Sequence, residues 1–168
     1  MILCAGEALI DMLPRESTGA EACFAPVAGG AVFNTAIALA RLGAPAALFT
    51  GLSEDLFGQR LAAALAADRV DATLARCSAR PTTLAFVELT DGHARYAFYD
   101  ENTAGRMLSP ADLPTLPDTV GALFFGGISL VVEPCARAYE ALMLREAHGR
   151  VTMIDPNIRP GFIRDEAA

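Results

Sequence analysis

Residues 29–34 read Gly29-Gly30-Ala31-Val32-Phe33-Asn34, and an alanine-rich apolar run continues from there to Leu42-Gly43. The two glycines stand where a helix is predicted to begin, and without a Cβ they would let another molecule approach the backbone closely. A helix start also offers unpaired N–H groups and the positive end of the helix dipole. Asn34 lies about one turn further on, with a side chain that both donates and accepts hydrogen bonds. This arrangement suits a polyhydroxylated ligand, and it is equally compatible with a plain helix start whose glycines serve close packing.

Around this stretch, apolar strands alternate with helices along the chain. The predicted strands are 1–9, 46–50, 120–125 and 151–154, and the predicted helices are 31–42, 56–67 and 133–148, with a short one from Ser109-Pro110. Gly43 followed by Pro45 ends the first helix. Continuous apolar strands that alternate with helices indicate a parallel sheet covered by helices.

Two segments do not fit that sheet. Residues 22–27 form a short extended piece, and residues 83–89 and 94–99 alternate in polarity around the turn residues Asp91-Gly92. Asp-Gly between alternating runs is a strong hairpin signal. We therefore expect these segments to form a separate small antiparallel sheet.

Composition limits the class of protein. The chain has 168 residues, 53% of them hydrophobic and 20% charged, and a formal net charge of −7. This is enough for one domain with a sizeable core. The acidic balance, without a basic cluster, argues against nucleic acid and anionic membranes as partners. No apolar run approaches the roughly 20 residues of a membrane span, and the start has no basic region typical of a signal peptide.

The four cysteines, Cys4, Cys23, Cys77 and Cys135, are widely spaced and form no C-x-x-C pair. The two histidines are also far apart, so no zinc site is expected. We expect buried free thiols in a reducing cytoplasm.

With these features placed, the sequence resembles the ribokinase-like (PfkB) carbohydrate kinases, and within them the fructokinase-like branch. The resemblance lies in Gly29-Gly30-x-x-x-Asn34-x-Ala36, in Gly43 and in 51–58, together with the opening 6–11 and the closing 155–160. It covers nearly the whole chain in the family's order. Two positions depart from the pattern: Val32 stands where a proline is usual, and Ser53 where a glycine is usual.

The resemblance implies an α/β fold, with a ribokinase-like parallel sheet flanked by helices and a small antiparallel β lid. Residues 1–168 would be the N-terminal part of one such domain, with lid segments near 12–27 and 80–102. The family's second half, with its Gly-Ala-Gly-Asp motif, catalytic aspartate and most of the ATP pocket, has no counterpart in this sequence. We expect a longer kinase of which this is the N-terminal portion.

For the sugar, the resemblance implies contacts from Asp11, Gly29, Gly30 and Asn34. Polar groups gather beyond the carboxyl ends of parallel strands, and Asp11 is expected to follow the first strand there. A carboxylate accepts hydrogen bonds from sugar hydroxyls. The alternative for Asp11 is a turn-forming aspartate at a strand end.

For the phosphates, the candidates follow the last strand: Asp155, Asn157 and Arg159. Arg159 could neutralise charge on the transferring phosphoryl group. Asn157 could hold a phosphate oxygen or a magnesium-bound water, and the resemblance places Asp155 with it beside ATP and Mg²⁺. The alternative is a structural ion pair between Arg159 and Asp155. The general base is not expected in this chain, and no metal ligands are predicted.

The hairpin is expected to be the lid that excludes water. Arg95 and Phe98 on its second strand are the candidate sugar contacts, with Phe98 and Tyr99 on opposite faces. The aromatic residues are equally suited to packing between the lids of two subunits, which would give a homodimer. Asp100 and Glu101 would repel a sugar acid, so a neutral sugar is favoured, while Arg95 keeps 2-keto-3-deoxygluconate open.

The sequence therefore favours ATP-dependent phosphorylation of a sugar hydroxyl, with fructose first and another sugar or a nucleoside as the alternative. A Rossmann oxidoreductase is disfavoured because Gly6-Glu7-Ala8 lacks the G-x-G-x-x-G pattern after the first strand. A non-catalytic sugar-binding or regulatory module remains the alternative from another class. It would apply if the native chain ended at Ala168.

Overall fold

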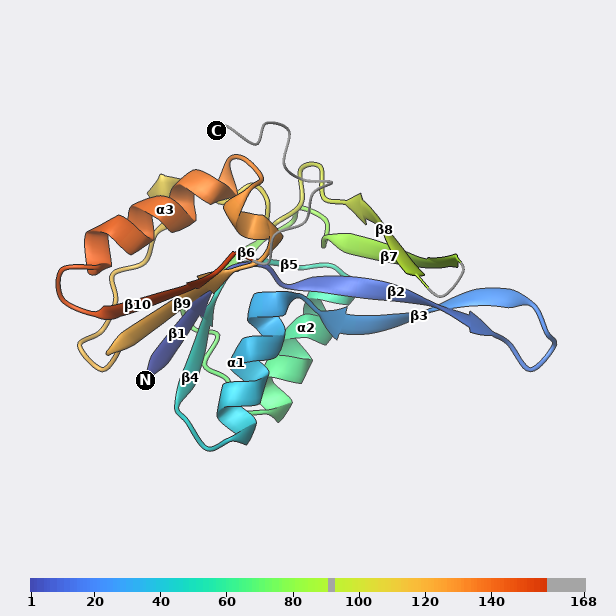
Figure 1. The fold of residues 1–168 in the computed structure, drawn as a ribbon, viewed down its shortest axis with the longest axis horizontal. Helices are drawn as coiled ribbons and strands as arrows, with labels where there is room; N and C mark the ends of the chain where they lie inside the picture. Colours follow the sequence, from blue (N-terminus) through green and yellow to red (C-terminus); the bar gives the residue numbers. More distant parts are fainter. Residues whose placement is uncertain (91–92, 157–168) are drawn as a thin grey trace.

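The main sheet consists of four parallel strands in the order β10-β9-β1-β4 (Figure 1). The computed structural model describes residues 1–90 and 93–156. The strands are β1 (Ile2–Ala5), β4 (Ala46–Phe49), β9 (Ala122–Gly126) and β10 (Val151–Asp155). The parallel α/β prediction is therefore confirmed, and each of the four predicted strand ranges contributes a strand to this sheet.

Helices cover both faces of this sheet. Helix α3 (Cys135–Glu146) lies on one face, and α1 (Ala31–Arg41) and α2 (Leu56–Ala67) lie on the other (Figure 1). Side chains alternate along β1, so Leu3 packs in the core with α3, while Cys4 packs in the second core with α1 and α2. The continuous apolar strands are thus explained by burial on both faces.

Local sequence signals set the ends of these helices. Gly43 has φ +87° and its N–H donates to the Ala40 carbonyl oxygen, which closes α1 as predicted. The Asp55 carboxylate caps α2 by accepting from the N–H groups of Phe57 and Gly58. The predicted short helix is the 3₁₀ turn η1 (Pro110–Asp112), where Asp112 accepts from the amide and hydroxyl of Ser109.

A second sheet projects from the main body in the order β3-β2-β7-β8 (Figure 1). Its strands are β2 (Leu9–Glu16), β3 (Ala22–Gly29), β7 (Leu84–Thr90) and β8 (His93–Tyr99). They form two antiparallel hairpins, and the predicted small sheet is present. The hairpins are joined by a short parallel pairing of β2 with β7, which the sequence analysis did not anticipate. We call this sheet the lid.

The single strand predicted for residues 1–9 is wrong. The chain forms β1 in the main sheet, breaks at Gly6-Glu7-Ala8, and continues as β2 in the lid. A tyrosine fixes the break, because the Tyr139 hydroxyl donates to the Gly6 carbonyl oxygen at 3.1 Å. Asp11 consequently lies on a lid strand and does not follow a strand of the main sheet.

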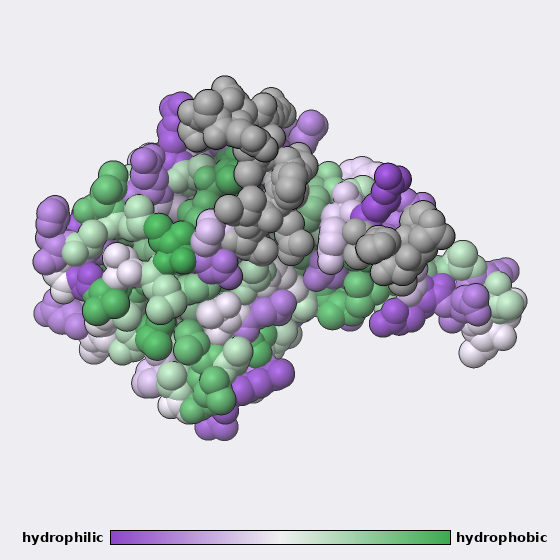
Figure 2. Space-filling model, in the orientation of Figure 1, coloured by the Kyte–Doolittle hydropathy of each residue, from purple (hydrophilic) through white to green (hydrophobic). Residues whose placement is uncertain are grey.

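A further parallel pair, β5 (Gly51–Ser53) and β6 (Arg76–Ser78), was also not predicted. Hydrophobic surface is visible over the edge of the main sheet where β10 lies (Figure 2). There Val151 and Met153 are 68% and 62% exposed. Within the described residues, no helix has the length and apolar character needed to cross a membrane.

Candidate active site

The candidate site lies where the lid leaves the main sheet (Figure 1). The carboxyl end of β1 runs through Gly6-Glu7-Ala8 into β2, and β3 returns from the lid into the start of α1. The carboxyl ends of β9 and β10 lie next to that of β1, because the three strands are parallel neighbours. In open parallel sheets this edge is the usual place for ligands.

Asp11 stands on the lid face that bears Phe98. The register pairs Asp11 with Ala85, and Ala85 with Phe98, so the three side chains project to one face. The Asp11 side chain is half-buried, and burial raises the pKa of its carboxyl group. In the described ranges, 1–90 and 93–156, no hydrogen bond or ion pair occupies this carboxylate. Its acceptor oxygens are thus available to a hydroxylated ligand.

Gly29 and Gly30 bring the backbone close to two acidic side chains. A Cβ on Gly29 would collide with the Asp11 carboxylate. Gly30 has φ +108°, and a Cβ there would lie 2.9 Å from the Glu7 carbonyl oxygen. Both glycines are therefore required by contacts inside the chain, which favours close packing among the two explanations that the sequence analysis left open.

The start of α1 is not an open set of N–H groups, which corrects the sequence analysis. The Ala31 N–H donates to the Glu7 carboxylate at 2.9 Å, and the Phe33 N–H donates to the Glu7 carbonyl oxygen at 3.3 Å. The Glu7 carboxylate also accepts from the Ser129 hydroxyl at 3.0 Å. Burial raises the pKa of Glu7, while the hydrogen bonds from Ser129 and the α1 amides oppose that shift. The sequence analysis assigned no role to Glu7.

Asn34 lies in the first turn of α1 and its side chain is exposed. Its N–H donates to the Gly30 carbonyl oxygen at 2.9 Å, which continues the helix. The side-chain carboxamide of Asn34 makes no hydrogen bond to any residue of the described part of the chain. Asp11, Gly29, Gly30 and Asn34 are therefore brought to one corner of the molecule, between the lid and α1.

Arg95 lies on the other face of the lid. Strand β8 alternates, so Arg95 and Tyr99 project opposite to Phe98. Arg95 is paired in the register with Glu88. The structure thus brings Phe98 to the Asp11 face and does not bring Arg95 there.

Asp155 ends β10 beside the turn after β9. It is exposed and paired in the register with Gly126, and its carbonyl oxygen accepts from the Gly127 N–H at 3.4 Å. It is therefore at the same edge of the sheet as Glu7. The other two predicted phosphate residues, Asn157 and Arg159, lie outside the described residues.

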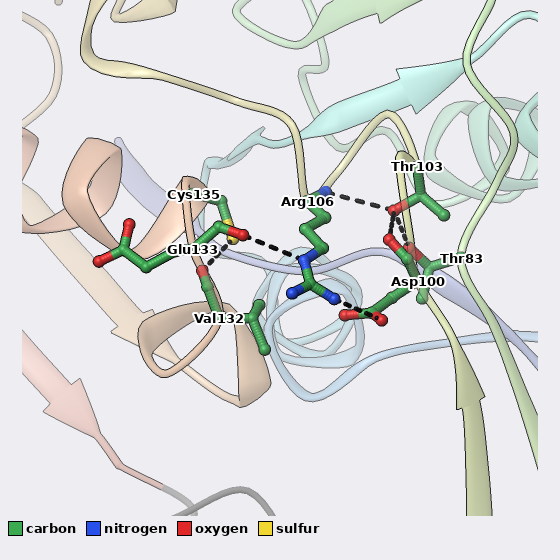
Figure 3. A network of polar contacts seen from close by, with 7 residues as sticks. All are labelled: Thr83, Asp100, Thr103, Arg106, Val132, Glu133 and Cys135. Atoms are coloured by element: carbon green, nitrogen blue, oxygen red, sulfur yellow. Dashed lines mark hydrogen bonds and ion pairs between the residues drawn. The ribbon is translucent and has the colours of Figure 1, made fainter. Parts of the chain in front are cut away.

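A polar network ties the base of the lid to the loop before α3 (Figure 3). The Thr83 hydroxyl, just before β7, donates to that of Thr103 at 2.8 Å. The Arg106 guanidinium pairs with Asp100, just after β8, at 2.8 Å and donates to the Glu133 carbonyl oxygen at 3.0 Å. Both ends of the β7–β8 hairpin are thus anchored.

The ion pair with Arg106 removes one reason for excluding a sugar acid as the substrate, namely the negative charge of Asp100. Because Arg106 neutralises it, Asp100 is not the free negative charge that the sequence analysis set against a sugar acid. The same pairing occupies Arg106, so neither side chain is free to select a charged substrate. Glu101 is exposed and forms no ion pair with any residue in the described ranges 1–90 and 93–156.

The cysteines are free thiols, as predicted, but the expectation that all are buried is wrong. Cys4 and Cys135 are buried, and Cys23 and Cys77 are exposed. Burial raises the pKa of both Cys4 and Cys135 to about 12, so these two thiols stay protonated. No cluster of three or more His, Cys, Asp or Glu side chains that could hold a metal is found among the described residues.

The profile of the pfkB family carbohydrate kinases matches residues 1–168, the whole chain. The chain belongs to the PfkB family. A relative from Rhizobium leguminosarum bv. trifolii, named fructokinase, is 60% identical over 166 residues, and the match covers 99% of this chain and 51% of the relative. A relative from Oryza sativa subsp. japonica, named fructokinase-1, is 39% identical, with 99% of this chain and 54% of the relative covered.

A solved structure of a fructokinase agrees with this assignment. The fructokinase from Xylella fastidiosa with bound ATP superposes with a TM-score of 0.87 at 30% identity, over 98% of this chain and 54% of that one. The chain thus spans about half the length of the relatives it matches. The ribokinase-like fold with its additional sheet is confirmed.

Proposed function

We propose that this chain forms the sugar-binding half of an ATP-dependent fructokinase. The observation that carries the proposal is the Asp11 carboxylate, which is half-buried on lid strand β2 beside Gly29 and unpaired in the described part of the chain. Leaving a partly desolvated carboxylate without a partner costs stability, which is typical of residues kept for a ligand. The 60% identity to a protein named fructokinase supports fructose as the sugar.

In this proposal Asp11 accepts hydrogen bonds from sugar hydroxyls, and Asn34 adds a donor and an acceptor from α1. Phe98, on the Asp11 face of the lid, packs against the apolar side of the sugar ring. Gly29 and Gly30 contribute backbone atoms at the same corner. Closing the lid excludes water from the hydroxyl that receives the phosphoryl group.

We further propose that Asp155, Asn157 and Arg159 face the phosphates of ATP. Asp155 has the position for this role, since its exposed carboxylate ends β10 at the ligand edge of the sheet. Mg²⁺ typically binds through one or two carboxylates together with substrate phosphates, so a single carboxylate here fits a metal that arrives with the nucleotide. When bound, Mg²⁺ neutralises charge on the phosphates. Arg159 would supply a fixed positive charge at the transferring group.

A neutral sugar suits the site better than 2-keto-3-deoxygluconate. A sugar acid needs a free cation for its carboxylate. Arg95 projects from the opposite face of the lid, and Arg106 is already paired with Asp100. Fructose carries no charge, so its binding requires neither Arg95 nor Arg106.

The opposite lid face suits a second copy of this chain, as in a homodimer. Phe24, Phe86 and Tyr99 form a chain of edge-to-face contacts there, and Phe24 and Tyr99 are 48% and 62% exposed. A hollow of about 970 Å³ beside them has both Glu88 and Arg95 in its lining. Acidic and basic groups thus occur on one surface, which is what an isologous contact needs if opposite charges are to pair across its two-fold axis. Sedimentation of the purified protein tests this, and a monomer at micromolar concentration would contradict it.

The function is tested on the full product of the gene that encodes this chain. The purified protein is supplied with ATP, Mg²⁺ and either D-fructose or 2-keto-3-deoxygluconate, and ADP release is followed. We expect turnover with fructose and a kcat/KM at least about tenfold lower for the sugar acid. No turnover with either sugar would overturn the proposed fructokinase activity, and a preference for the acid would overturn fructose as the substrate.

A further inference from the structure

Glu7 is a buried carboxylate that joins three separate parts of the chain. Glu7 lies in the connection between β1 and β2, and only 9% of the residue is exposed. One carboxylate oxygen accepts from the Ala31 N–H at 2.9 Å, at the start of α1. The other accepts from the Ser129 hydroxyl at 3.0 Å, in the 3₁₀ turn η2 (Ile128–Leu130) after β9. Gly30 and Asn34, two of the sugar contacts proposed above, belong to the start of α1.

The backbone around Glu7 is shaped to hold this carboxylate. Gly30 and Gly127 have φ of +108° and +72°, which side chains rarely adopt. A Cβ on Gly127 would collide with the Glu7 carboxylate, and a Cβ on Gly30 would lie 2.9 Å from the Glu7 carbonyl oxygen. The site is therefore built closely around one side chain, on both sides of it.

The charge of Glu7 is compensated by the helix rather than by a cation. The chain has no lysine, and no described Arg or His forms an ion pair with Glu7. Gly30, the N-cap of α1, has no side chain with which to bond the free amides. Glu7 supplies that bond from a distant strand end, where the positive end of the helix dipole favours a carboxylate.

We propose that Glu7 is a positioning residue of the sugar site: it fixes the start of α1, with Gly30 and Asn34, against the turn after β9. This inference rests on the proposed function. Glu7 is too buried to touch the sugar itself, so its effect passes through the residues it holds. The link to Asp11 is indirect: Gly29 precedes Gly30 in the chain and leaves the space that the Asp11 carboxylate occupies, so displacement of Gly30 would also disturb Asp11.

A purely structural role predicts a different result from a positioning role. Loss of stability alone lowers the amount of active protein, and hence the apparent kcat, without changing the KM for the sugar. Displacement of Gly30 and Asn34 weakens sugar binding and leaves the KM for ATP unchanged. The two roles are therefore separated by the two KM values.

The test compares Glu7→Ala and Glu7→Gln with the matched control Asp112→Ala, all in the full gene product. Asp112 also accepts from one backbone amide and one serine hydroxyl, both of Ser109, but in η1 away from the sugar site. We expect Glu7→Ala to raise the KM for fructose by about tenfold or more, with the KM for ATP within about twofold of wild type. Glu7→Gln keeps an acceptor for the Ala31 amide and should recover most of the loss. Asp112→Ala should leave both KM values unchanged.

If Glu7→Ala does not fold, Ser129→Ala and Glu7→Gln provide the test. Each weakens one side of the contact, and each should raise the KM for fructose by about two- to fivefold. An unchanged fructose KM in all Glu7 and Ser129 variants would overturn the proposal. So would an equal rise in Asp112→Ala, or an equal rise in the KM for ATP.

A second measurement separates failure of this inference from failure of the proposed function. Amide exchange at Ala31 and Phe33 should accelerate in the Glu7 and Ser129 variants and stay unchanged in Asp112→Ala. If the gene product phosphorylates no sugar, the proposed function fails, and this exchange still decides whether Glu7 fixes the start of α1. Exchange at the wild-type rate in the Glu7 variants would overturn the positioning role.

Discussion

At the residue scale, the Asp11 carboxylate should bind the sugar at the expense of stability. Asp11→Asn removes the charge but keeps the size of the side chain. Hydrogen bonds to a charged group contribute about 1.5–3 kcal/mol, so we expect the KM for fructose to rise roughly 10- to 100-fold. Because burial raises the pKa of Asp11, its ionised form is disfavoured in the folded protein. The free energy of unfolding at pH 7 should therefore stay equal or increase, which chemical denaturation would measure. A variant with unchanged fructose KM would remove Asp11 from the site.

Acidification should weaken sugar binding through the same residue. The raised pKa means that Asp11 takes up its proton at a higher pH than an ordinary aspartate, whose pKa is about 3.9. As pH falls through this range, the KM for fructose should rise. The same protonation should raise the free energy of unfolding, because the cost of the buried charge is fully present above the raised pKa and is lost as pH falls from there towards the ordinary aspartate pKa of the unfolded chain. The KM measured across this range should change for the wild type and stay flat for Asp11→Asn. Identical profiles would contradict the assignment.

The sequence predicted Asp11, Gly29, Gly30 and Asn34 as sugar contacts, because Asp11 ends the opening pattern 6–11 and the other three stand in the pattern 29–34. It did not identify the role of Glu7, whose two partners are 24 and 122 residues away along the chain. Such contacts depend on tertiary structure, and local pattern cannot predict them. A charged residue inside an apolar run, as in Cys4-Ala5-Gly6-Glu7-Ala8-Leu9, was the one available signal. In a strand buried on both faces, a glutamate indicates a break.

At the scale of elements, Arg106 should control the mobility of the β7–β8 hairpin. It joins Asp100 to the Glu133 carbonyl oxygen at the lid base. Arg106→Ala removes both contacts, so amide exchange in β7 and β8 should accelerate while exchange in the main sheet stays unchanged. The control is Arg137→Ala, which removes an exposed ion pair with Glu133 at 3.3 Å and should change nothing. Equal exchange in the two variants would show that Arg106 does not anchor the lid.

The element predictions succeeded where the periodicity was strong and failed where two elements share one apolar run. Helix α2 was predicted with the bounds it has, from the apolar positions Leu56, Leu61 and Leu65, and the structure shows that Asp55 caps its start. The division of residues 2–16 into β1 and β2 was missed, since both strands are apolar where they meet. The parallel pairing of β2 with β7 was missed for another reason: it joins segments about seventy residues apart without a local signal.

At the scale of the molecule, this chain presents an open edge to solvent. Strand β10 is the outermost strand of the main sheet, and its residues Val151, Met153 and Ile154 are 68%, 62% and 49% exposed. Apolar strands of parallel sheets are normally covered on both faces. The relatives it matches are about twice as long, so in them further chain is available to cover the corresponding edge.

The 168-residue chain by itself should therefore not transfer phosphate at an appreciable rate. Phosphoryl transfer needs a positioned hydroxyl, a base that takes its proton and compensation of charge at the γ-phosphate. The chain offers Asp11 and Asn34 for the sugar and Arg159 for the charge, but no glycine-rich loop followed by an aspartate. Loss of a general base alone costs about 10²–10⁴-fold. Residues 1–168 and the full gene product are to be compared side by side with fructose and ATP. We expect background ADP release from the short chain, and turnover equal to that of the gene product would mean that the base lies within these residues.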